Sequence, residues 1–145
     1  HMVGIKMFKI LENLRMRAEN HDKSKLVPPE KDGWDLMDKE PSYRYGTVEY
    51  YKKMKKYYEV FKHHYDVNSH HPEHYGNDIS KMDLLDIIEM LCDWLSYKED
   101  LTDEEIDSTI KGQCKRFNFS DEMQSILINT AHRNFSKSYF NENDI

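Results

Sequence analysis

Apolar residues recur at helical spacing along most of this chain, and this periodicity restricts the fold more than any other feature. Ile5, Phe8, Leu11 and Leu14 form one such stripe, which predicts a helix over residues 5–20. We expect further helices from near Pro29 and over residues 47–68, 80–97, 102–117 and 120–135. The 145 residues include only 5 Gly and 4 Pro, and no segment has a convincing strand pattern. The sequence therefore predicts an all-α bundle of five to six helices, as a single domain over residues 1–145.

Polar residues that can cap helices begin three of these segments. Ser80 and Ser120 each stand directly before an apolar-periodic run, and we expect each to cap its helix. Thr102 is followed three residues later by Glu105, which predicts a capping box.

The rest of the sequence favours a cytoplasmic protein. No apolar run approaches the roughly 20 residues that a membrane span needs, and the N-terminus has no signal-peptide pattern. His1-Met2 resembles a cloning remnant, and residues 136–145 are expected to form a flexible tail. Cys92 and Cys114 lie in apolar-periodic segments, which predicts reduced core thiols. The net charge of −6 argues against a broad nucleic-acid surface, and tyrosine-rich helix faces are compatible with a homodimer.

Histidines are concentrated in the stretch "HHYDVNSHHPEHYG", residues 63–76, which holds five of the eight in the chain. Imidazole is a metal ligand, a base near neutral pH and a polar packing group. Either these side chains converge on one site, or the stretch is a solvated polar turn. His64 and Asn68 are four residues apart and share a helix face, and His70-His71 follows where Pro72 disfavours further helix.

Three carboxylates lie on a helix that is otherwise apolar on most sides. Asp86, Glu89 and Asp93 are spaced i, i+3, i+7, so they share one face. Burying an ionised carboxylate alone costs several kcal/mol or raises its pKa until it becomes neutral. This face therefore either meets solvent or meets cations. Imidazoles that face carboxylates across the preceding turn are the usual components of a divalent metal site.

The order of these residues resembles the HD-domain superfamily of metal-dependent phosphohydrolases. The chain has His21-Asp22-x-x-Lys25, then His64, then His70-His71-x-Glu73, and then Asp93 inside an apolar helix. The patterns "HDxSK", "HHxxxNxHHPEH" and "DxIEMxCDW" are most similar to those of an uncharacterised family of small HD-like proteins of bacteria and their phages. The resemblance covers roughly residues 10–98. It implies a cytoplasmic location in a bacterium or an infected host cell.

The resemblance implies a metal centre held in a helical bundle. Asp22 would bridge two ions, and Asp93 would complete the ligand set from the apolar helix. Lys25 would lie near a substrate phosphate, and Glu73 or Glu89 would orient or deprotonate the attacking water or support the ligands. One or two ions of Mn, Fe, Co, Ni or Zn suit imidazole and carboxylate donors. The implied metal ligands are His21, Asp22, His64, His70, His71 and Asp93.

The expected activity is hydrolysis of a nucleotide or related phosphate ester by metal-activated water, so the expected partner is a small phosphorylated substrate. The superfamily's usual histidine one helix before the His21-Asp22 pair is missing, since only His1 lies upstream. A catalytically weak HD-like module that sequesters a nucleotide or a protein partner is therefore the alternative. A di-iron oxygenase uses similar ligands, but the sequence offers no independent support for it.

Overall fold

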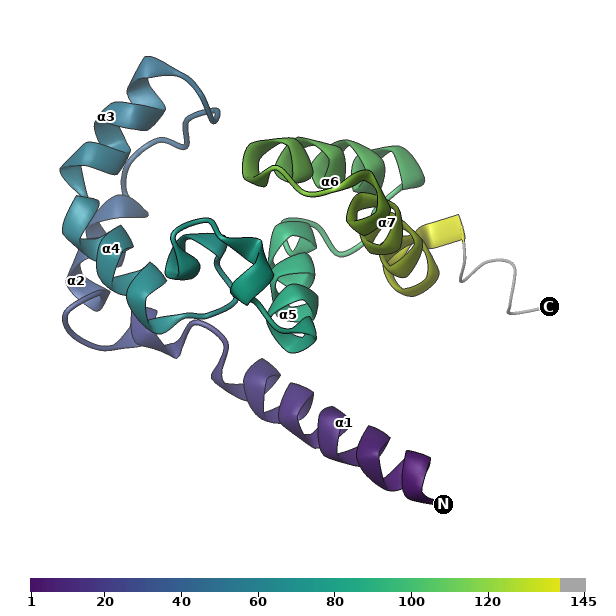
Figure 1. Cartoon of the computed structure of the whole chain (residues 1–145). Coiled ribbons are helices and arrows are strands. Elements are labelled where there is room, and N and C mark those ends of the chain that lie inside the picture. Colours follow the sequence, from purple (N-terminus) through teal and green to yellow (C-terminus); the bar gives the residue numbers. More distant parts are fainter. Residues whose placement is uncertain (139–145) are drawn as a thin grey trace. The chain divides into compact units, whose positions relative to one another are not determined.

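The computed structural model describes residues 1–138 of the chain, and within them every regular element is a helix (Figure 1). These residues form seven α-helices and three short 3-10 helices, with no strand. The all-α prediction is confirmed, with one or two helices more than expected. The chain divides into two compact units, His1–Gly76 and the part from Asn77 onward. The expectation of a single domain over residues 1–145 stays a prediction.

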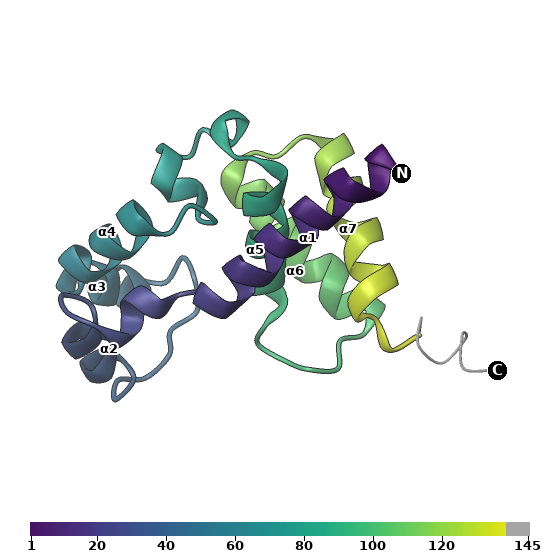
Figure 2. The same ribbon diagram turned by 90° about the horizontal axis from the view of Figure 1, so that it is seen from below.

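The first unit holds four α-helices and two 3-10 helices, all drawn from purple to teal in Figures 1 and 2. The expected helix over residues 5–20 is confirmed, and so is a short helix close after Pro29. The elements are α1 (Met2–Asn20), η1 (Lys23–Leu26), α2 (Lys31–Met37), α3 (Val48–Lys56), α4 (Tyr58–Val67) and η2 (Pro72–Tyr75).

The single long helix expected over residues 47–68 is wrong, because the helix breaks at Tyr57. There φ is −107° and ψ is 25°, which lies outside the α-helical range. The Tyr57 ring is buried, and its hydroxyl donates a hydrogen bond of 2.7 Å to Glu40 Oε1. The break thus lets an aromatic side chain pack inward while its polar end meets a partner from the preceding loop. Periodicity alone did not indicate this, because α3 and α4 each continue the helical spacing.

Helix α2 packs tightly against α4, and this contact positions the candidate site. Gly33 lies on α2 so close to Val60 of α4 that an added Cβ would overlap the valine methyl groups. Glu30, the residue directly before α2, is fully buried. The close approach of the two helices therefore brings the Glu30 carboxylate to the histidines of α4.

The second unit contains η3 (Ile79–Lys81), α5 (Leu84–Leu95), α6 (Asp103–Phe117) and α7 (Asp121–Phe135). Helices α6 and α7 lie side by side, and α5 contacts α6. Their apolar faces meet in one hydrophobic core, which is the main source of stability expected for this unit. The buried members of this core are Ile87, Met90, Leu91, Leu95, Leu101, Ile106, Ile110, Cys114, Leu127 and Ala131.

Two of the three predicted caps are confirmed. Thr102 and Glu105 form the expected capping box, and Ser120 accepts a hydrogen bond from the Met123 amide. Ser80 does not cap α5, because the helix begins three residues later. Asp83 caps it instead, in a box completed by the Asp86 carboxylate, which accepts from the Asp83 amide.

Asp86 therefore does not lie on a solvent-facing surface. Its side chain is buried, and its carboxylate stabilises the first turn of α5 by accepting a backbone N–H. Of the three carboxylates that share a face in the sequence, one is thus explained by capping.

Two further expectations need correction. Cys92 is exposed, so only Cys114 is a core thiol, and burial raises the pKa of Cys114 to about 11. Ser136 is buried and forms a bridge with Leu101, so residues 136–138 do not belong to a flexible tail. Residues 139–145 of that predicted tail lie outside the described residues.

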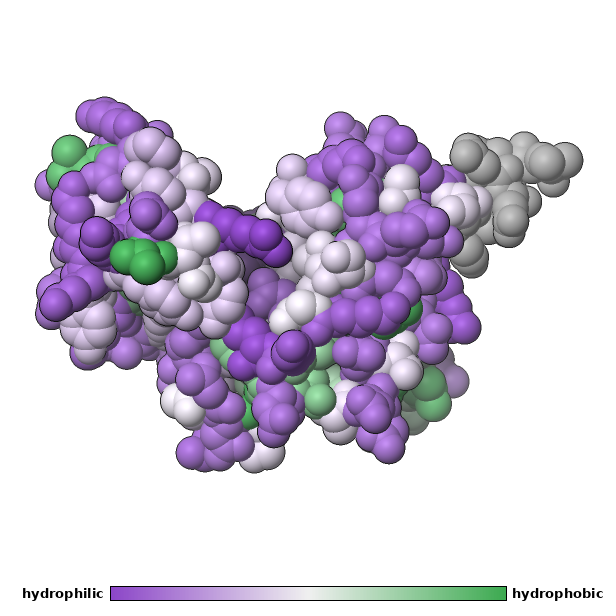
Figure 3. Space-filling view, turned by 90° about the horizontal axis from the view of Figure 1, so that it is seen from above, coloured by the Kyte–Doolittle hydropathy of each residue, from purple (hydrophilic) through white to green (hydrophobic). Residues whose placement is uncertain are grey.

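Within residues 1–138, no helix has the length and apolar character to cross a membrane. Hydrophilic side chains predominate on the face drawn in Figure 3, where apolar ones form small patches.

Candidate metal centre

The end of α1 and the turn after it position the predicted His-Asp pair. Asp22 adopts the left-handed conformation, with φ 52° and ψ 21°, which aspartate tolerates better than most residues but at an energetic cost. The 3-10 turn that follows has the Lys25 amide donating to the Asp22 carbonyl at 2.9 Å. This turn brings the Lys25 ammonium to 2.6 Å from Asp22 Oδ2. The strained residue thus carries the carboxylate at the centre of the candidate site.

The three predicted histidine ligands of the later stretch converge on that carboxylate. His64 lies on the last turn of α4, while His70 and His71 follow in the turn before η2. His64 and His70 are each 2% exposed, so these imidazoles are buried rather than solvated. Ring centroids are 4.1 Å apart for His70 and His71, and 4.8 Å apart for His64 and His71. The histidine-rich stretch is therefore a convergent cluster and not a polar surface turn.

Asp22 is shared by two groups of three potential ligands. One group is His21, Asp22 and His70, and the other is Asp22, His64 and His71, with the donor atoms of each group within 4.8 Å of one another. His64 Nε2 and His70 Nε2 each lie 3.5 Å from Asp22 Oδ1, and His64 Nε2 lies 2.9 Å from His71 Nε2. Bonds of about 2.0–2.2 Å to one ion place its donor atoms roughly 2.9–3.5 Å apart. The spacing of these atoms fits a divalent cation.

The Asp22 carboxylate provides an independent test of that fit. Its Oδ1 atom is buried and accepts no hydrogen bond from the described residues. A buried carboxylate oxygen without a partner costs several kcal/mol, and proteins avoid it unless a charge is supplied. A divalent cation held between Asp22 and the adjacent imidazoles satisfies this oxygen.

Glu30 is a site residue that the sequence reasoning missed. Its fully buried carboxylate accepts hydrogen bonds from His64 Nδ1 at 3.0 Å, His63 Nδ1 at 2.8 Å and Trp34 Nε1 at 3.0 Å. Burial raises the pKa of the Glu30 carboxyl, but the hydrogen bonds that it accepts outweigh that effect and leave the pKa below its usual value. Glu30 is therefore ionised at neutral pH. No signal near Glu30 in the sequence indicates this role, because a glutamate at the start of a short helix is ordinarily a surface residue.

The contact with Glu30 determines which nitrogen of His64 faces the cluster. Because Nδ1 carries the proton that it donates to Glu30, the unprotonated Nε2 of neutral His64 points at Asp22 and His71. Burial lowers the pKa of His64 and outweighs the opposing effect of the nearby carboxylates. A neutral imidazole oriented by a carboxylate on its other nitrogen is the usual state of a histidine that binds a metal ion.

The other histidines and Asn68 lie around this cluster. His63 contacts Glu30, as a supporting rather than a ligating side chain. Asn68 donates from its amide to Ser24 Oγ at 2.9 Å and so ties the end of α4 to η1. His74 is exposed, and its Nδ1 donates to the Tyr65 carbonyl at 2.8 Å.

The remaining predicted site residues, namely the catalytic candidates Lys25, Glu73 and Glu89 and the metal ligand Asp93, belong to neither of the two groups that share Asp22. Lys25 pairs with Asp22, and its ammonium also lies 4.6 Å from the centre of the Trp34 ring. Glu73 is half-buried on η2 and lines a separate pocket. Glu89 and Asp93 are half-buried on α5 in the second unit, and their roles at a metal centre stay predictions.

The fold and the cluster define an all-α protein whose first unit has a histidine and aspartate site that could hold a metal ion. The chain belongs to a family of unknown function, DUF5662, whose model matches residues 1–137. No curated protein and no solved structure matches the chain.

Proposed function

We propose that this protein is a metal-dependent phosphohydrolase that acts on a nucleotide or a related phosphate ester. The observation that carries the proposal is the buried Asp22 Oδ1 atom, which faces two imidazole nitrogens at 3.5 Å and accepts no hydrogen bond among the described residues. The resemblance of the ordered motifs to the HD-domain superfamily supports the choice of reaction. The proposed ligands are His21, Asp22, His64, His70 and His71, and Asp93 is added on the resemblance alone.

A bound divalent ion of Mn, Fe, Co, Ni or Zn supplies a water of lowered pKa and a positive charge for a phosphoryl oxygen. Burial keeps His64 neutral, and Glu30 orients it, because Glu30 accepts a hydrogen bond from the Nδ1–H group and leaves Nε2 toward the cluster. Lys25 lies at the carboxylate, where its ammonium can offset the charge that develops on a phosphate. Glu73 or Glu89 is the proposed group for orienting or deprotonating the water, or for accepting hydrogen bonds from the metal ligands.

A turnover assay tests this proposal. The metal-loaded full chain is incubated with nucleoside mono-, tri- and cyclic phosphates, and product formation is followed by chromatography. We expect turnover with at least one metal and its loss in Asp22→Asn. Asp38→Asn is the matched control, because Asp38 is exposed and lies outside both ligand groups. No turnover with Mn, Co, Fe or Ni, in samples with measured bound metal, would contradict the proposal.

A second candidate is a binding module that retains a nucleotide or a protein partner without efficient hydrolysis. The observation that favours it is the ion pair of 2.6 Å between Lys25 and Asp22. The Lys25 ammonium already offsets part of the negative charge of the Asp22 carboxylate, which a second metal ion would otherwise neutralise. The missing upstream histidine supports the same reading. Calorimetry on the wild type distinguishes the two: tight nucleotide binding without turnover supports the module, whereas weak binding with turnover supports the enzyme.

A further inference from the structure

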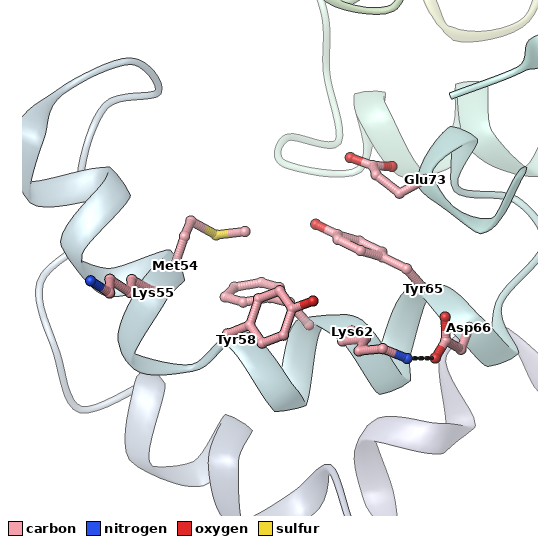
Figure 4. A pocket seen from close by; sticks show the side chains of 8 residues that line it. Met54, Lys55, Tyr58, Lys62, Tyr65, Asp66 and Glu73 are labelled. Carbon is pink, nitrogen blue, oxygen red and sulfur yellow. Dashed lines mark hydrogen bonds and ion pairs between the residues drawn. The ribbon is translucent and has the colours of Figure 1, made fainter. Parts of the chain in front are cut away.

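A pocket of about 420 Å³ lies in the first unit, outside the ligand groups (Figure 4). Its volume falls within the roughly 300–1,000 Å³ range of small-molecule sites. The lining comes from α3, α4 and η2 and is mostly aromatic and apolar. The residues are Met54, Lys55, Tyr58, Phe61, Lys62, Tyr65, Asp66 and Glu73.

The side chains of this pocket offer aromatic surfaces together with a few polar groups. Figure 4 shows Met54, Tyr58, Tyr65 and Glu73 extending toward a common space. Lys62 turns instead to Asp66, with which it forms an ion pair. The pocket therefore presents two phenol rings, a thioether and a carboxylate to a ligand.

The charges of the lining argue against a phosphate group inside the pocket. Two lysines and two carboxylates contribute to it, so their formal charges cancel. A neutral group suits such a lining better than an anion does. The aromatic rings favour a planar ring that can stack, and Glu73 favours N–H donors on the edge of that ring.

The pocket shares one wall with the candidate metal centre. The Tyr65 ring lines the pocket, and its centroid lies 5.0 Å from that of His71 and 6.0 Å from that of His64. Glu73 follows His71 by two residues, on the 3-10 helix that begins after this histidine. A small molecule held against Tyr65 therefore lies next to His64 and His71, two of the proposed metal-binding residues.

We infer that this pocket holds the amino-bearing nucleobase of the substrate, with Tyr58 and Tyr65 as the aromatic surfaces and Glu73 as the acceptor for the amino group. This inference rests on the proposed function, because it assigns the base-binding part of the same substrate. It makes Tyr58, Tyr65 and Glu73 specificity-determining residues. Glu73 then contacts the base, and Glu89 is left as the proposed group at the water.

The test observes the pocket directly and does not depend on turnover. The full chain, labelled with ¹³C at the methionine methyl groups and loaded with metal, is titrated with adenosine and followed by NMR. We expect the Met54 methyl signal to shift because a stacked base places its ring current there. Met7 and Met16 on α1 are internal controls outside the pocket and should not shift.

Matched variants then assign the contact. Tyr58→Ala is expected to weaken adenosine binding roughly 5- to 100-fold, as loss of one base-stacking partner does. Tyr51→Ala is the control, because Tyr51 is 55% exposed, close to the 58% of Tyr58, and does not line the pocket. Circular dichroism of both variants checks that they fold. An unshifted Met54 signal at millimolar adenosine, or equal binding by the two variants, would overturn the inference.

A comparison of two phosphorylated compounds separates this inference from the proposed function. Adenosine 5′-monophosphate and ribose 5-phosphate differ only in the base. Equal turnover of the two would overturn the base pocket and leave the hydrolase intact. Adenosine binding that is sensitive to Tyr58→Ala, with no hydrolysis of any nucleotide, would support the pocket and refute the hydrolase.

Discussion

Replacing Glu30 by Gln tests how the cluster is oriented. The amide has nearly the same shape as the carboxylate but lacks its charge, and only its oxygen accepts hydrogen bonds. Glu30 Oε1 accepts from His63 Nδ1, while Oε2 accepts from His64 Nδ1 and Trp34 Nε1. In the variant an NH₂ group must replace one of these two oxygens: on the Oε2 side, buried His64 and Trp34 lose their acceptor, and on the Oε1 side the half-buried His63 loses its charged partner.

The expected cost follows from those contacts. Hydrogen bonds to charged groups contribute about 1.5–3 kcal/mol each, and a buried unsatisfied donor costs about 1–3 kcal/mol. We therefore expect Glu30→Gln to lower the free energy of unfolding by about 2–4 kcal/mol. Metal affinity should fall by about 10- to 100-fold, because a supporting carboxylate orients the ligating imidazole.

The pH dependence has a defined sign. The folded-state pKa of Glu30 lies below its usual value of 4.5, so the stabilisation by its charge is present above about pH 4.5. It is lost as the pH falls through the lowered pKa, because the protonated carboxyl no longer accepts as an anion. The difference in the free energy of unfolding between wild type and Glu30→Gln should shrink as the pH falls from about 4.5 through the folded-state pKa of Glu30.

Urea unfolding with added chelator gives the stability, and a competitive metal chelator gives the affinity. Glu19→Gln is the matched control, because Glu19 is exposed on α1 and its ion pair with Arg15 contributes little. If Glu30→Gln binds metal as tightly as Glu19→Gln does, Glu30 does not orient a metal ligand. A loss of stability without a loss of affinity would make it a structural acceptor only.

Two further outcomes test the packing within each unit. Gly33→Ala should lower the free energy of unfolding in urea by about 1–3 kcal/mol, because the new methyl group meets Val60. Gly112→Ala is the control and should be neutral or stabilising, because its new methyl group meets no atom. Equal effects of the two substitutions would contradict the packing of α2 on α4. With a thiol reagent at pH 8, Cys92 should react faster than Cys114, because Cys92 is exposed whereas Cys114 is buried. Burial raises the pKa of both thiols, and that of Cys114 reaches about 11. Two equally fast thiols in the native protein would refute this.

The sequence predicted the helices and the convergent histidines because both depend on short-range patterns. The spacing of apolar residues identified α1, α6 and α7, and the capping residues Thr102 and Ser120 fixed two helix starts. The density of histidines in residues 63–76 indicated a cluster. In the structure, His64, His70 and His71 belong to groups that could hold a metal ion.

The features that the sequence did not predict depend on contacts between distant residues. Glu30 lies 34 positions before His64, and nothing local distinguishes it from a surface glutamate at the start of a short helix. At the break, the buried Tyr57 donates a hydrogen bond to Glu40, 17 positions earlier. Asp83 replaced Ser80 as the cap of α5 because a 3-10 turn takes up residues 79–81.

Elemental analysis of the purified full chain tests the central claim most directly. Inductively coupled plasma mass spectrometry is applied to wild type, Asp22→Asn and Asp38→Asn after identical loading with Mn, Co, Fe, Ni or Zn and removal of free metal. We predict one or two equivalents of a transition metal in wild type and in Asp38→Asn, and a loss of at least one equivalent in Asp22→Asn, because Asp22 belongs to both ligand groups. Metal content near zero in wild type, or equal content in all three proteins, would contradict the account.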